Sequence, residues 1–101
     1  MSRKSLDSGK IETILKNLKP RLVKEFGIKR IGYFGSFSRD EPDSDDSDVD
    51  ILVELDHIPG WEFFELHTLL ETELGRRVDL ATYESLKKQL RAPILKEVRF
   101  I

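Results

Sequence analysis

The stretch GYFGSFSRDEPDSDDSDVDILVEL, residues 32–55, joins a Gly-Ser pair, an acidic loop and an apolar run. Nine acidic residues and no lysine or arginine lie between Asp40 and Asp56. After the loop, acidic and apolar residues alternate, which predicts a strand with Asp48 and Asp50 on one face and the valine and isoleucine side chains on the other. Carboxylates this close repel each other unless a positive charge lies between them.

The segment in front of this stretch predicts a helix and a strand. Apolar residues recur at helical spacing over residues 8–26, and Gly27 is placed to end that helix. Pro20 lacks an amide hydrogen and crowds the preceding turn, so we expect either a kink there or a second helix that starts there. The residues RIGYFGS then predict a short strand that runs into a turn.

Two helices and one strand are predicted after residue 55. A proline and glycine pair precedes an amphipathic helix in which Trp61 and Phe64 lie on the buried stripe and Phe63 lies off it. The residues RVDLAT predict a third short strand. Apolar spacing then predicts a last helix that continues to the end of the chain, with a new helical turn at Pro93.

This order of elements predicts a single α/β domain over residues 1–101, of the α+β kind, with a small mixed sheet of about three strands packed against helices. A length of 101 residues is enough for one modest core. The sequence has no cysteine and no apolar run of membrane-spanning length, and the residues MSRKSLDSGK at its amino end lack the apolar segment typical of a signal peptide. We therefore expect a cytoplasmic protein without a membrane partner.

The strand aspartates predict a metal site. Asp48 and Asp50 lie roughly 7 Å apart between Cα atoms on one strand face, and hard oxygen ligands of this kind suit Mg²⁺ or Mn²⁺. The competing interpretation is an acidic strand start that faces water. Asp79 is a third acid, in an otherwise apolar strand, and either a share in the site or a salt bridge to Arg76 or Arg77 would explain it.

Residues beside the acidic loop predict contacts to phosphate. Gly35 and Ser36 end a strand where a helical turn begins, so backbone amides and a hydroxyl are available there. Arg39 follows one turn later and can hold a phosphate group or a loop carboxylate. The remaining loop acids are interpreted as solvated side chains: Asp43, Asp45 and Asp46.

Together these features resemble the DNA polymerase β-type nucleotidyltransferase superfamily, in which a Gly-Ser turn is followed by a loop and an Asp-x-Asp strand. The segments EFGIKRIGYFGS, ELGRRVDLAT and ESLKKQLRAPILKEVRFI narrow the resemblance to the minimal nucleotidyltransferases, over residues 11–101. This sequence differs from the family pattern at two points. The loop between Ser36 and Asp48 is one residue longer than usual, and Asp40 stands where a glycine usually follows the arginine.

The resemblance implies metal-dependent transfer of a nucleoside monophosphate, AMP in the first instance, from a nucleoside triphosphate to an acceptor hydroxyl, with release of pyrophosphate. It implies two Mg²⁺ ions, or Mn²⁺ in their place. The positions that match the family's catalytic and metal-binding acids are Asp48, Asp50 and Asp79, and those that match its nucleotide-binding positions are Gly35, Ser36 and Arg39.

The resemblance also implies a partner. Minimal nucleotidyltransferases work beside a helical protein of the HEPN class, so we expect such a protein as the acceptor and this chain as the antitoxin of a toxin–antitoxin pair. A second copy of the chain is another way to close the site. The alternative is a catalytically weak nucleotide- or nucleic-acid-binding module, which would present the basic residues Lys87, Lys88, Arg91, Lys96 and Arg99 to phosphates.

Overall fold

The computed structural model of the protein describes residues 6–40 and 48–101. In chain order its elements are α1 (Ser8–Phe26), β1 (Ile28–Phe34), η1 (Gly35–Phe37), β2 (Val49–Leu55), α2 (Glu62–Leu74), β3 (Val78–Thr82), η2 (Tyr83–Ser85), α3 (Lys88–Glu97) and β4 (Arg99–Phe100). The two elements named η are short 3₁₀ turns. Within these ranges no helix is both long enough and apolar enough to cross a membrane.

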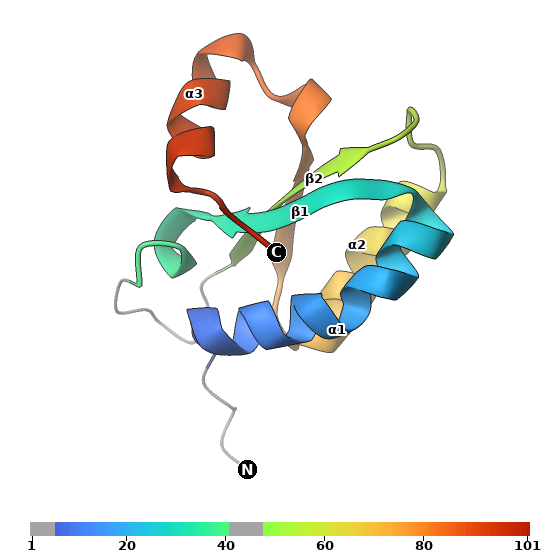
Figure 1. Ribbon diagram of the computed structural model, residues 1–101, viewed down its shortest axis with the longest axis horizontal. Helices are drawn as coiled ribbons and strands as arrows, with labels where there is room; N and C mark the ends of the chain where they lie inside the picture. The colour runs from blue at the N-terminus through green and yellow to red at the C-terminus, as the bar shows by residue number, and fades with distance from the viewer. Residues whose placement is uncertain (1–5, 41–47) are drawn as a thin grey trace.

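The strands form one mixed sheet in the order β3-β2-β1-β4. β1 pairs antiparallel with β2 and β4, and β2 pairs parallel with β3, which α2 makes possible by crossing between them. α1 and α2 lie on one side of the sheet, and α3 lies on the other (Figure 1). The prediction of a small mixed sheet against helices is confirmed, and the sheet has one strand more than expected.

The first helix begins and ends where the sequence predicts. Asp7 caps α1 by accepting a hydrogen bond from the Lys10 amide at 2.9 Å, and Gly27 ends it in left-handed backbone with a φ of 68°. Pro20 lies inside this one helix, so the expectation of a second helix that starts there is wrong. Because Pro20 has no amide hydrogen, the Lys16 carbonyl lacks its helical hydrogen-bond donor. Both residues are exposed, so water can reach that carbonyl.

The carboxyl end of the chain is a strand, which corrects the prediction of a helix to the last residue. α3 ends at Glu97, and β4 then pairs with β1. Just beyond β4, the Ile101 amide donates to the Ile31 carbonyl at 2.9 Å. Gly32 permits this approach, because a Cβ there would lie 2.6 Å from the Arg99 carbonyl oxygen. Pairing with the open edge of β1 therefore prevails over the helical spacing of the last apolar residues.

Pro93 lies inside α3, which corrects the prediction that it starts a new helical turn. Its ring leaves the Gln89 carbonyl without a helical partner, and both residues are exposed. Solvent can satisfy this oxygen, so the helix continues through the proline.

The hydrophobic core lies between the sheet and the helices α1 and α2. Trp61 and Phe64 are 83% and 64% exposed, so the prediction that they lie in the core is wrong, and Phe63 is the half-buried one. The buried stripe of α2 consists of Leu66, Leu70 and Leu74. Phe64 precedes Leu66 by two positions, about 200° around a helix, and therefore points away from the sheet.

Candidate active site

Asp50 and Asp79 are in-register neighbours across the parallel pair β2 and β3. Adjacent strands lie about 4.8 Å apart and in-register residues share a face, so the two side chains leave the sheet side by side. Asp48 directly precedes β2, is exposed, and has its Oδ1 3.6 Å from Nε of Arg77. Of the two arginines considered as partners of Asp79, Arg77 pairs with Asp48 instead.

Gly35 packs directly against Asp50. The last residue of β1, Phe34, is the pairing partner of Asp50, and Gly35 follows it in left-handed backbone with a φ of 75°. A Cβ at this position would lie 2.1 Å from Oδ2 of Asp50. Both the backbone angle and the lack of space for a side chain therefore require glycine here.

The environment of Asp50 raises the pKa of its carboxyl group to about 6. Burial is the largest cause, followed by the negative charges of Asp79, Asp48 and Glu97, whereas Arg39 acts in the opposite direction. Three acidic side chains therefore act on the Asp50 carboxyl group at this end of the sheet.

The donor chemistry of these carboxylates fits a hard divalent cation, since Mg²⁺ and Mn²⁺ prefer oxygen ligands. Gly35 leaves the Asp50 carboxylate space that a side chain would fill. Among residues 6–40 and 48–101, however, no three acidic, histidine or cysteine side chains are already arranged to hold an ion. Oδ1 of Asp48 lies toward Arg77, and because this ion pair is exposed and therefore weak, it presents only a small barrier to a cation that binds this oxygen.

The predicted phosphate-binding residues lie on the tight turn η1 and directly after it. The Ser38 hydroxyl donates to the Gly35 carbonyl at 2.8 Å, and the Arg39 amide donates to the Ser36 carbonyl at 3.2 Å. These bonds fold the chain back immediately behind β1. Since Gly35 touches Asp50, the turn and the acidic strand belong to one site.

Glu97, the last residue of α3, joins this site although no sequence pattern singles it out. Its Oε1 accepts a hydrogen bond from the Gly35 amide at 3.0 Å, and its Oε2 lies 2.8 Å from Nη1 of Arg39. Glu97 is 58 residues from Arg39 in the chain, and only the pairing of β4 with β1 brings it here.

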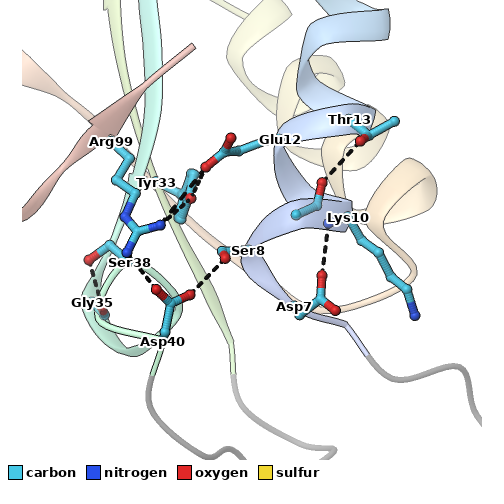
Figure 2. Close-up of polar contacts among 11 residues, drawn as sticks. Asp7, Ser8, Lys10, Glu12, Thr13, Tyr33, Gly35, Ser38, Asp40 and Arg99 are labelled. Carbon is cyan, nitrogen blue, oxygen red and sulfur yellow. Dashed lines mark hydrogen bonds and ion pairs between the residues drawn. The ribbon is translucent and has the colours of Figure 1, made fainter.

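Asp40 holds the start of the acidic loop in place. Its φ of 54° lies in the left-handed region, which suits the glycine found there in the family that the sequence resembles. Its carboxylate accepts hydrogen bonds from the Ser8 hydroxyl and from Nη2 of Arg99, both at 2.7 Å, and these contacts lower its pKa (Figure 2). Arg99 also approaches the Tyr33 hydroxyl, which donates to the Glu12 carboxylate (Figure 2). The next loop acids, Asp43, Asp45 and Asp46, lie outside the described residues.

The basic residues considered for nucleic-acid binding do not all face outward together. Arg99 is paired with Asp40. Arg91 stacks its guanidinium over the Tyr83 ring at 5.0 Å and donates from Nη2 to the Glu84 carbonyl at 3.3 Å. These internal contacts reduce the positive surface that α3 and β4 can offer to a polyanion.

Comparison with known proteins agrees with this geometry. Residues 15–101 match the family described as Nucleotidyltransferase domain. The protein adenylyltransferase MntA of Thermococcus cleftensis is 46% identical over 92 residues, which are 90% of this chain and 92% of that protein. A solved minimal nucleotidyltransferase has a TM-score of 0.82 at 28% identity, over 96% of this chain and 98% of that one. A chain from the complex of AMPylated HEPN toxin with MNT antitoxin of Shewanella oneidensis shares the fold, with a TM-score of 0.64 at 22% identity over 94% of this chain and 71% of that one.

Proposed function

The chain belongs to the nucleotidyltransferase domain family and is a transferase, and from that premise we propose that it moves AMP from ATP to a hydroxyl group of a partner protein. The observation that carries the proposal is the pairing of Asp50 with Asp79 directly beside the Gly35 turn. A protein acceptor and an adenylyl donor are favoured by the sequence relative named a protein adenylyltransferase.

We assign Asp48, Asp50 and Asp79 as the ligands of two Mg²⁺ ions, with Mn²⁺ as a substitute. Bound cations would neutralise the carboxylates and stabilise the negative charge that develops on the transferred phosphoryl group. The same assignment gives the raised pKa of Asp50 a functional reason. Burial raises this pKa most, and the negative charges of Asp79, Asp48 and Glu97 add to the effect; a bound cation would favour the charged carboxylate and so offset both causes.

The chain's own groups then have separate tasks. Ser36 and the turn amides bind the outgoing phosphates, and Asp79, which is exposed at the sheet edge, accepts the proton of the acceptor hydroxyl. The acceptor oxygen forms a bond to the α-phosphorus while the bond from that phosphorus to the bridging oxygen breaks. The bridging oxygen keeps the electron pair and leaves as part of pyrophosphate.

As acceptor we propose a helical protein of the HEPN class, with this chain as the antitoxin. The sequence relative MntA supports the protein-modifying chemistry. In the complex that contains a chain of the same fold, the HEPN toxin is AMPylated, and we extend that pairing to the present chain.

The proposal is tested by incubating the purified chain with each α-labelled nucleoside triphosphate, Mg²⁺ or Mn²⁺, and the helical protein encoded beside it. We expect label from ATP on the helical protein, and loss of that label with Asp48→Asn and Asp50→Asn. Asp56→Asn, an exposed aspartate at the far end of β2, is the matched control and should transfer normally. Transfer at the wild-type rate by either site variant would refute the assignment, and nucleotide binding without any transfer would favour a binding module.

A further inference from the structure

Glu97 occupies donors that this site offers to an anion. One carboxylate oxygen takes the Gly35 amide at 3.0 Å and the other lies 2.8 Å from the Arg39 guanidinium. A backbone amide in a tight turn together with an arginine fork is the donor set that binds phosphate oxygens. The donor set therefore already holds an anion, and that anion comes from the chain itself.

The contacts of Glu97 and those of a triphosphate exclude each other. The Gly35 amide carries one hydrogen, which cannot point at the Glu97 carboxylate and at a phosphate oxygen at once with good geometry. Two anions at one arginine also repel each other, because a phosphate group brings further negative charge to within a few ångströms of the carboxylate. A phosphate that binds the turn must therefore displace the Glu97 side chain.

Little holds Glu97 in place besides these two donors. Its side chain is 31% exposed, and α3 contains no fully buried residue. It also adds negative charge next to Asp50, on which the charges of Asp79 and Asp48 already act. Rotation of one side chain into solvent is enough to clear the turn, without unfolding of α3 or β4.

We propose that Glu97 is an internal substitute for phosphate, which holds the Gly35 turn and Arg39 in place while no nucleotide is bound and sets the nucleotide affinity by competing for the same donors. The inference rests on the proposed function only in that the competing ligand is a triphosphate. Glu97 is then a positioning residue whose release accompanies nucleotide binding. It has no part in the bond-breaking step.

Calorimetric binding of inorganic triphosphate and of ATP to the full chain tests this inference without any acceptor. Glu97→Gln removes the charge and keeps the size of the side chain, so we expect both ligands to bind about tenfold more tightly, as for the loss of one charged hydrogen bond. Adenosine, which has no phosphate, should bind both proteins equally. Glu84→Gln removes one exposed carboxylate on η2 and is the matched control, expected to stay within about twofold of wild type.

A second measurement uses the wild-type chain, so it does not depend on the variant folding. In an NMR titration with ATP, the Gly35 amide and the Glu97 side-chain carboxyl carbon should shift together and saturate at the same ATP concentration. Two results would overturn the inference. One is triphosphate binding by Glu97→Gln that is unchanged or weaker than in the wild type. The other is a Glu97 carboxyl signal that stays constant while the Gly35 amide signal saturates.

The two proposals can fail separately. Tighter triphosphate binding by Glu97→Gln together with no AMP transfer by any variant would support the role of Glu97 and refute the proposed function. Normal AMP transfer by the wild-type chain, with a triphosphate affinity that is unchanged in Glu97→Gln, would support the proposed function and refute the role of Glu97.

Discussion

At the scale of single residues, Gly35 and Asp50 depend on each other. Gly35 has a φ of 75°, and its missing side chain leaves the space that Oδ2 of Asp50 occupies. Gly75 offers a comparison, since it has a φ of 67° but nothing within 4 Å of its hypothetical Cβ. Substitution of Gly75 by alanine would therefore incur backbone strain alone, whereas substitution of Gly35 would incur backbone strain and a collision with Asp50.

We therefore predict that Gly35→Ala destabilises the protein more than Gly75→Ala does. The backbone angle alone should cost about 1 kcal/mol in either variant. The approach to Asp50 should add at least about 1 kcal/mol in Gly35→Ala, as for an overpacked site. Urea unfolding of the two variants measures the difference, and equal losses would mean that Asp50 moves aside without cost.

Asp50 should also make the stability of the protein depend on pH. Its pKa rises from the ordinary 3.8 to about 6 in the folded state, so the folded protein binds more protons than the unfolded chain between these values. The stability associated with this group is present below about pH 4 and is lost as the pH rises toward 6. The shift sets an upper limit of about 3 kcal/mol, which partial solvent access should reduce to about 1 kcal/mol.

Replacement of the ionisable Asp50 side chain by a neutral one should remove this loss of stability at higher pH. We predict that Asp50→Asn is more stable than the wild type by about 1 kcal/mol at pH 7.5 in the presence of a chelator, and that the two proteins are equally stable at pH 4. Urea unfolding at both pH values measures this, with Glu73→Gln, which removes an exposed carboxylate on α2, as the control. A wild type that is the more stable protein at pH 7.5 would contradict the cause assigned to the pKa shift.

At the scale of elements, the periodicity of apolar residues predicted α1, β2 and α2, because each of these elements buries a face that its own sequence defines. β1 and β3 were predicted from strand-forming residues and the turns beside them. It did not predict which side of α2 is inward at its first turn, where Trp61 and Phe64 are exposed. It also missed β4, because a two-residue strand has no pattern of its own and exists only through the edge of β1.

Two replacements on or beside α2 separate the buried stripe from the exposed aromatic residues. Leu70→Ala should cost about 2–5 kcal/mol of unfolding free energy, because Leu70 is fully buried. Trp61→Ala should change it by at most about 0.5 kcal/mol, because Trp61 is 83% exposed. Chemical denaturation measures both, and a large loss in Trp61→Ala would mean that this ring is covered by the fold.

The pairing of β4 with β1 should depend on Gly32. A Cβ at this position would lie 2.6 Å from the Arg99 carbonyl oxygen, so Gly32→Ala should push β4 away from the sheet. We predict that the Ile101 amide, which donates to the Ile31 carbonyl, then exchanges its hydrogen about tenfold faster. Gly9→Ala, where the nearest atom is 3.4 Å from the Cβ position, is the control. Unchanged exchange in Gly32→Ala would show that β4 adapts to the larger side chain.

At the scale of the whole molecule, the site combines residues that the sequence marks and residues that only the fold brings together. The Gly-Ser turn and the Asp-x-Asp strand are local patterns, so the sequence predicted Gly35, Ser36, Asp48 and Asp50 as site candidates. Glu97 and the contacts of Asp40 with Ser8 and Arg99 join opposite ends of the chain, and no short pattern encodes such contacts.

The most direct test of the proposed transferase site is the mass of the helical partner after incubation with ATP and Mg²⁺, comparing the wild-type chain with Asp79→Asn. Asp79 is the informative residue, because its in-register pairing with Asp50 is the observation on which the proposed function rests. We predict that the wild-type chain adds at least one AMP to the partner and that Asp79→Asn does so at least about a hundredfold more slowly while it still binds ATP. Modification of the partner by Asp79→Asn at the wild-type rate would contradict the proposed function of this site.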